Sequence, residues 1–145
     1  MLSVEYIPMQ YYDAIVIHFT DDDGYGHNII VDGGEIFSPK ICYTDKLKVH
    51  LEKIFNKRES IDLWIITHID NDHIGGLYHF INDGVFFEKN HAQLKEVWMN
   101  YGGDGDFVVQ RKGVIGYNSG KKLRNVLHEK KINLKEGVIA GISRD

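Results

Sequence analysis

The sequence predicts an α+β fold, in which a mixed sheet is flanked by helices. Three short segments rich in β-branched and aromatic residues come first, and a helical pattern and a buried strand follow them. The chain has 145 residues, 43% hydrophobic and 26% charged, which suits one globular domain over residues 1–145. Its 15 glycines against 2 prolines indicate many tight turns.

The opening strands are predicted at residues 2–7, 14–19 and 28–31. Between the last two lies the acidic, glycine-containing segment 21–26, which suits a hairpin turn. The same segment partly resembles a calcium-binding loop. That interpretation is weak, because Tyr25 stands where a ligand oxygen is expected and Asp32 stands where a glutamate should close the loop.

An amphipathic helix is predicted next, with Thr44 as its N-terminal cap. Its apolar face consists of Leu47, Leu51, Ile54 and Phe55. A nearly continuous apolar run over residues 61–67 then predicts a strand covered on both faces, which leads directly to His68. The later predicted elements are a short helix around Leu77, Phe80 and Ile81, a strand over residues 96–101, a glycine-rich loop over residues 102–106, and a helix over residues 119–131.

The most informative stretch is Thr67-His68-Ile69-Asp70-Asn71-Asp72-His73-Ile74-Gly75-Gly76. It places two imidazoles and two carboxylates close together, directly after the buried strand. In a loop leaving that strand, His68 and Asp70 can point to one side. Asp72 and His73 can point to a neighbouring position, so that each of two metal ions could be held by one pair. A metal would also relieve the repulsion between the two carboxylates.

A solvated surface loop is the alternative interpretation, because most clusters of His and Asp face water. The coincidence of four ligand groups, a preceding buried strand and two glycines that allow a sharp turn favours the metal site. The six histidines outside this stretch are expected to be structural, with His79 and His91 the best further ligand candidates. Cys42 is the sole thiol and has no evident imidazole partner, so catalysis by a side-chain nucleophile is poorly supported.

The stretch resembles the metal-binding loop of the metallo-β-lactamase superfamily, usually His-x-His-x-Asp-His. It is most similar to the branch written Ser/Thr-His-x-Asp-x-Asp-His-x-Gly-Gly, typified by the hydrolase domain attached to bacterial competence DNA-uptake channels. Residues 13–17 and 30–34 resemble the opening hairpin of that fold. The resemblance covers residues 1–145, and the loop is its specific part.

The resemblance implies a four-layer αββα sandwich with metals at one edge of the two sheets, this chain being the N-terminal half. It implies that His68 and Asp70 bind the first of two divalent ions, which could be Zn, Mn or Fe. Asp72 and His73 would bind the second, and Asp72 would also orient the attacking hydroxide. Because Asp70 is a harder donor than imidazole, we expect a shift from strict zinc preference towards manganese, iron or magnesium.

Asp32 matches an aspartate that supports the metal loop in this fold, although an ordinary turn aspartate before two glycines explains it equally well. The further ligands that the family brings from its C-terminal half, two histidines and an aspartate, have no counterpart here. We therefore expect a domain truncated at its C-terminus, with residues 143–145 leading into a further strand. An uncovered sheet face would favour a homo-oligomer or association with a C-terminal half.

The expected function is metal-dependent hydrolysis by a water activated between two metal ions. Phosphodiesters, in a nucleic acid or a small molecule, are the leading substrate class by analogy with the aspartate-containing branch. Lys121, Lys122 and Arg124 could attract such an anion, but a solvated helix surface explains them better. The alternative is a catalytically incompetent fragment that acts as a binding or assembly subunit, because half of the expected ligands are absent.

Charge and hydropathy limit the partners and the location. A net charge of −4 and a pI near 6.0 argue against nucleic-acid binding through bulk positive charge. The N-terminus lacks the basic start and apolar run of a signal peptide, and no apolar run approaches the roughly 18 residues that span a bilayer. We expect a cytoplasmic protein with no membrane partner, and the single cysteine fits a reducing compartment.

Overall fold

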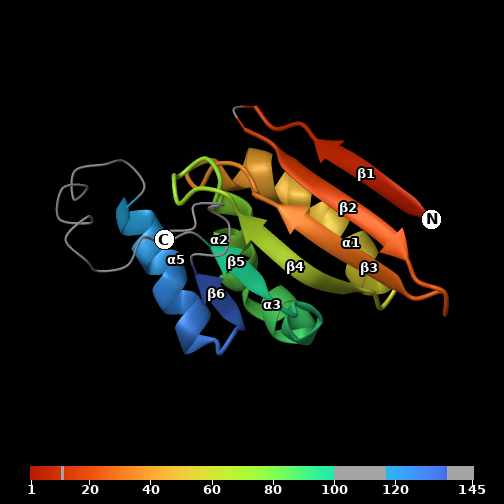
Figure 1. The fold of residues 1–145 in the computed structure, drawn as a ribbon. Helices are drawn as coiled ribbons and strands as arrows, with labels where there is room; N and C mark the ends of the chain where they lie inside the picture. Colours follow the sequence, from red (N-terminus) through yellow and green to blue (C-terminus); the bar gives the residue numbers. More distant parts are fainter. Residues whose placement is uncertain (11, 100–116, 137–145) are drawn as a thin grey trace, which may run out of the picture.

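The computed structural model describes residues 1–10, 12–99 and 117–136. This part of the chain forms a mixed six-stranded sheet with a layer of helices on one face (Figure 1). The predicted α+β class is confirmed. The sheet and its helical layer correspond to the N-terminal half of the expected sandwich.

The strands lie in the sheet in the same order as in the chain. β1 (Leu2–Ile7), β2 (Ala14–Thr20) and β3 (Gly26–Val31) form an antiparallel meander. β4 (Ser60–Ile66), β5 (Val97–Met99) and β6 (Leu134–Glu136) then continue the sheet in parallel with β3. The three opening strands and the hairpin between the last two are therefore confirmed.

The helices lie in the three parallel connections. Between β3 and β4, the π-helix η1 (Pro39–Leu47) continues directly into α1 (Lys48–Asn56). Between β4 and β5 come α2 (Gly75–Ile81), α3 (Gly84–Asn90) and the short 3₁₀ helix η2 (His91–Gln93). α5 (Tyr117–Glu129) precedes β6.

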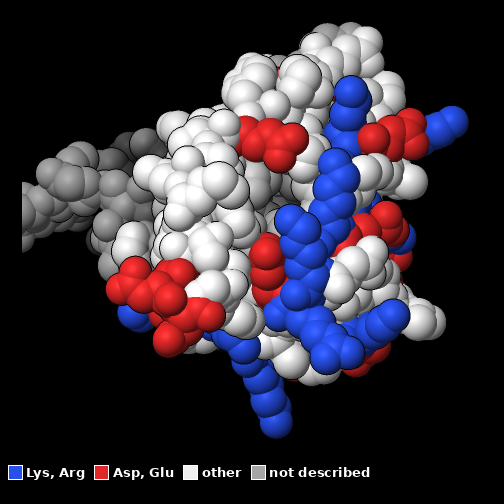
Figure 2. Space-filling view, turned by 90° about the vertical axis from the view of Figure 1, so that its right-hand side faces the viewer, with Lys and Arg blue, Asp and Glu red and all other residues white. Residues whose placement is uncertain are grey.

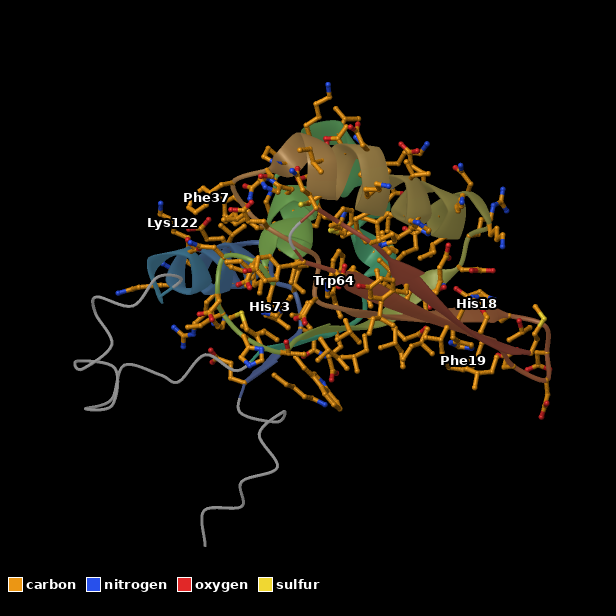
Figure 3. The ribbon with its side chains drawn as sticks, turned by 90° about the horizontal axis from the view of Figure 1, so that it is seen from above. His18, Phe19, Phe37, Trp64, His73 and Lys122 are labelled. Carbon is orange, nitrogen blue, oxygen red and sulfur yellow. The ribbon has the colours of Figure 1, made fainter. Side chains whose placement is uncertain are left out.

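All of these helices cover the same face of the sheet. Parallel connections are right-handed in nearly all proteins, and these three advance along the sheet in one direction, which places their helices on one side. Inward residues of the strands and helices form a single hydrophobic core, in which Trp64, Leu51 and Leu127 are each fully buried. In the view along the sheet, Trp64 lies between the strands and the helices (Figure 3).

The opposite face of the sheet, here called the outer face, is also apolar. Pairing across the strands sets Ile17 opposite Ile29, and Val31 opposite Ile65. In the described part of the chain no helix lies on this face, and on β1 Leu2 is 70% exposed and Val4 65%. The outer face consists of Leu2, Val4, Tyr6, Ile15, Ile17, Phe19, Ile29, Val31, Leu63, Ile65 and Trp98.

Several local predictions were wrong or incomplete. Thr44 does not cap a helix, because the helix already begins at Pro39, where the missing N–H of proline costs nothing. The short elements α3 and β6 were not predicted. The strand predicted over residues 96–101 covers 97–99, while residues 100–101, the glycine-rich loop 102–106 and residues 143–145 lie outside the described residues. Among the described helices, none is long and apolar enough to cross a membrane.

Candidate metal centre

The loop that carries the predicted ligands begins where β4 ends, beside the end of β3. Val31 pairs with Ile65 in the parallel ladder, so that Asp32 and Thr67 leave the sheet side by side. The carboxyl ends of parallel strands form the edge of a sheet at which ligands commonly bind. The register of β3 and β4 therefore places Asp32 and the loop at an edge suited to ligand binding.

Asp32 connects the two strand ends through its side chain. Its Oδ1 accepts the backbone N–H of Thr67 at 2.8 Å, and its Oδ2 accepts the Thr67 hydroxyl at 2.7 Å. The same Oδ2 lies 3.0 Å from His73 Nδ1. The residue adopts a left-handed backbone conformation, with φ at 58°, and its side chain is only 13% exposed. These contacts match the supporting role rather than that of an ordinary turn aspartate.

The structure brings three of the four predicted ligands next to one another. His73 Nε2 lies 3.4 Å from Asp72 Oδ2, and the ring centres of His68 and His73 are 4.9 Å apart. His68 and Asp70 are exposed, whereas Asp72 and His73 are half-buried. Within the described residues, no three His, Cys, Asp or Glu side chains converge on a point that could hold a metal ion.

Glycines hold the loop against the end of β3 by close backbone contact. A Cβ on Gly75 would lie 2.4 Å from the carbonyl carbon of Glu35, and one on Gly33 would lie 2.8 Å from Gly76 Cα. The Gly75 N–H donates to the Gly34 carbonyl at 2.9 Å. Neither Gly75 nor Gly76 has a positive φ, so this glycine pair serves close approach rather than the sharp turn that was expected.

The chemistry of the donors fits a divalent cation. Imidazole nitrogens and carboxylate oxygens together suit zinc, manganese and iron. His73 points one ring nitrogen at Asp32 and the other towards Asp72, as a metal-binding imidazole held by a carboxylate does. In addition, the side-chain oxygen of Asn71 in the same loop is buried with no hydrogen-bond partner among the described residues.

Two residues near the loop were not assigned a role from sequence. The Thr67 hydroxyl lies 2.9 Å from His68 Nδ1, and the ring of Tyr12 lies 6.0 Å from that of His73. The position of Thr67 directly before His68 was the available signal. Nothing in the local sequence indicates Tyr12, which approaches the loop through the pairing of β1, β2 and β3.

The two further histidine candidates have other contacts. His79 Nε2 lies 2.7 Å from the carbonyl oxygen of Ile36, and His91 Nδ1 lies 2.9 Å from that of Glu88. His79 also packs beside the ring of Tyr43. These are the contacts of structural histidines, as expected from the sequence.

A second polar cluster lies at the other end of β3. His27 Nδ1 is 3.1 Å from Asp62 Oδ2, and its Nε2 is 3.1 Å from Asp21 Oδ2. Hydrogen bonds to these two carboxylates raise the pKa of His27, and the bond to His27 lowers the pKa of Asp21. Figure 3 shows His73 near one end of the sheet, and His18 and Phe19, which border this cluster, near the other.

Comparison with protein families decides the assignment of the fold. The model of the metallo-beta-lactamase superfamily matches residues 14–139, which include β2 to β6 and the whole loop. The chain belongs to the metallo-β-lactamase superfamily. Members of this superfamily are mostly hydrolases and typically bind divalent metals such as zinc. A search of curated proteins finds no match to the chain.

Proposed function

We propose that this metallo-β-lactamase-like domain is a metal-dependent hydrolase that uses two divalent ions, held by His68, Asp70, Asp72 and His73. The arrangement of Asp32 carries the proposal, because one carboxylate binds the loop backbone and orients His73 at the carboxyl ends of β3 and β4. Divalent ions bound there would lower the pKa of a water and stabilise developing negative charge.

The chain's own side chains have distinct roles in this proposal. His73 donates its Nδ1 proton to Asp32, so its Nε2 lone pair faces the side of the loop where Asp72 lies. Asp72 would orient the attacking water by accepting one of its protons. Asp70 adds an oxygen donor to the set, which favours manganese or iron over strict dependence on zinc.

The proposed substrate class is phosphodiesters, in a nucleic acid or a smaller molecule. The start of α5 lies against the loop, because a Cβ on Gly120 would be 2.8 Å from Ile69 Cβ. The neighbouring Lys121 and Lys122 are exposed there, whereas Arg124 is paired with Glu136 at 2.7 Å. At the other end of the molecule, a band of basic side chains has acidic side chains on either side of it (Figure 2). Within the described residues, this surface therefore has no continuous positive patch that could attract an anionic substrate. The two lysines are therefore the cations that support this substrate class.

Metal binding and hydrolysis test the proposal together. We expect the protein with manganese to cleave an activated phosphodiester such as bis(p-nitrophenyl) phosphate, and His68→Ala or Asp72→Asn to reduce this activity to background. His91→Ala is the matched control, because His91 contacts α3, at the carbonyl oxygen of Glu88 and the ring of Phe87. Full activity of both loop variants would overturn the proposal. Activity with zinc alone would contradict the expected metal preference.

A binding or assembly subunit without activity is the second candidate. Two observations favour it: the described residues assemble no complete set of metal ligands, and the outer face of the sheet is apolar. Isothermal titration of the wild-type protein with manganese and zinc separates the two candidates. Binding that His68→Ala abolishes supports the hydrolase, whereas no binding of either metal supports the subunit.

A further inference from the structure

The hydroxyl group of Thr67 lies between a carboxylate and an imidazole. Its Oγ1 is 2.7 Å from Asp32 Oδ2 and 2.9 Å from His68 Nδ1. The backbone N–H of Thr67 donates to the other oxygen of Asp32 at 2.8 Å, which fixes the residue relative to that carboxylate. A β-branched side chain is also stiff about its first torsion, so the hydroxyl has little freedom to turn away.

The positions of the protons in this cluster follow from what each group can donate. An ionised carboxylate only accepts hydrogen bonds, and a hydroxyl has a single proton. If the Thr67 proton pointed to His68, two acceptor oxygens would lie 2.7 Å apart with no proton between them. The proton therefore points to Asp32, and towards His68 Nδ1 the Thr67 oxygen can only accept. Nδ1 of His68 must then carry the proton.

We propose that Thr67 is a positioning residue through which Asp32 sets the tautomer of His68, while Asp32 sets that of His73 directly. In both rings Nδ1 then carries the proton and Nε2 keeps its lone pair. Asp32 Oδ2 accepts a hydrogen bond from the Thr67 hydroxyl and a second one from His73 Nδ1, which lies 3.0 Å away. One carboxylate thus prepares two imidazoles to bind a cation through the same ring nitrogen.

We call the chain of hydrogen bonds from Asp32 through Thr67 to His68 the relay. The exposed His68 depends on it for its tautomer, whereas the half-buried His73 contacts Asp32 directly. A neutral imidazole in water exchanges its proton between the two nitrogens and rotates freely, so a fraction of the rings presents the wrong nitrogen. The contact with Thr67 removes that freedom. The use of the freed Nε2 for metal rests on the proposed function, whereas the tautomer itself is a property of the metal-free chain.

Nitrogen-15 NMR of imidazole-labelled, metal-free protein tests the proposal at a mildly alkaline pH, where imidazole is neutral. His68→Gln assigns the His68 signals. In the wild type we expect His68 to show a protonated Nδ1 and an unprotonated Nε2. Thr67→Val keeps the shape and removes the hydroxyl, so His68 should become an average of both tautomers while His73 stays unchanged. Thr67→Ser should keep the wild-type spectrum.

The affinity for manganese and zinc, measured by competition with a chromophoric chelator, is the second readout. Thr67→Val should lower it by roughly 10–100-fold, and Thr67→Ser by much less. A wild-type His68 with its proton on Nε2, or a Thr67→Val spectrum identical to that of the wild type, would overturn the relay. If the wild-type spectrum is as expected and Thr67→Val alters it, but no metal binds, the relay stands and the proposed function fails.

Discussion

Each end of β3 carries a residue that contacts at least one partner from a distant part of the chain. At the carboxyl end, Asp32 contacts Thr67 and His73, and at the amino end His27 lies between Asp21 and Asp62. Phe19 stacks on the His27 ring, with the ring centres 4.8 Å apart. In the proposed function the first cluster arranges groups for metal binding, and the second joins the β2–β3 hairpin to the start of β4.

The His27 cluster predicts a pH dependence of stability. Because the folded-state pKa of His27 is raised above 6.5, its contribution to the free energy of unfolding is fully present below that pH and is lost as the pH rises through the folded pKa. Because the pKa of Asp21 is lowered below 3.8, its contribution is present above that pH and is lost as the pH falls through the folded pKa. The cluster should therefore contribute most between about pH 4 and pH 6.5.

Urea unfolding of the wild type and His27→Gln across this range measures the effect. The variant should lose most stability between about pH 4 and pH 6.5, and its difference from the wild type should shrink as the pH rises through the folded-state pKa of His27. His128→Gln is the control, because His128 is exposed on α5. A difference that stays constant over the whole range would contradict the assignment.

For single residues, the sequence predicts which side chains are candidate metal ligands, but not which distant residues they contact. The four ligand candidates follow from the motif, because their spacing is local. The contact of Thr67 with Asp32 could not be predicted, because Asp32 lies 35 residues earlier in the chain. Only the parallel pairing of β3 with β4 brings them together, and no local pattern specifies the register of that pairing.

Among the elements, the connection between β4 and α2 depends on backbone packing rather than on a turn. Gly75 and Gly76 begin α2 while touching the segment that follows β3. We expect Gly75→Ala to lower the free energy of unfolding by about 1–3 kcal/mol, because the new methyl group meets the backbone of Glu35, which has no flexible end to move aside.

Chemical unfolding of Gly75→Ala beside Val85→Ala tests this prediction. Val85 lies in the first turn of α3 and is 85% exposed, so its truncation should change stability by less than about 0.5 kcal/mol. Equal stability of Gly75→Ala and the wild type would show that the segment after β3 can move away from the loop.

Elements with a strong periodic pattern were predicted better than short ones. The predicted apolar set Leu47, Leu51, Ile54 and Phe55, at the end of η1 and in α1, is buried, and so are Leu123 and Leu127 of α5. The start of η1 was misplaced because Thr44 has the chemistry of a cap, whereas the helix begins five residues earlier at Pro39 and tertiary packing buries Cys42 and Tyr43 directly before Thr44. β6 has only three residues, two of them charged, so its assignment depends on pairing with β5.

For the whole molecule, the outer face predicts self-association. A contiguous apolar face of this kind is a common mark of an interface, and on it Leu2, Val4 and Tyr6 of β1 are each more than half exposed. We expect the isolated chain to form dimers through the outer face. Ile17→Lys, near the middle of the face, should shift the population to monomer.

Size-exclusion chromatography with light scattering, at several protein concentrations, measures this association. Val49→Lys is the control, because Val49 is 40% exposed on the helical layer. A wild-type chain that remains monomeric at high concentration would contradict the prediction. Dissociation by Val49→Lys as well as Ile17→Lys would move the interface away from the outer face.

The agreement between strand order and chain order has a consequence for how the molecule is made. Each strand pairs with the one synthesised just before it, so the sheet can grow at a single edge while the chain leaves the ribosome. Asp32 emerges first and can meet Thr67 and His73 only when β4 has docked. The hydrogen bonds of Asp32 can thus form only at the step of synthesis at which β4, the first strand parallel to β3, joins the sheet.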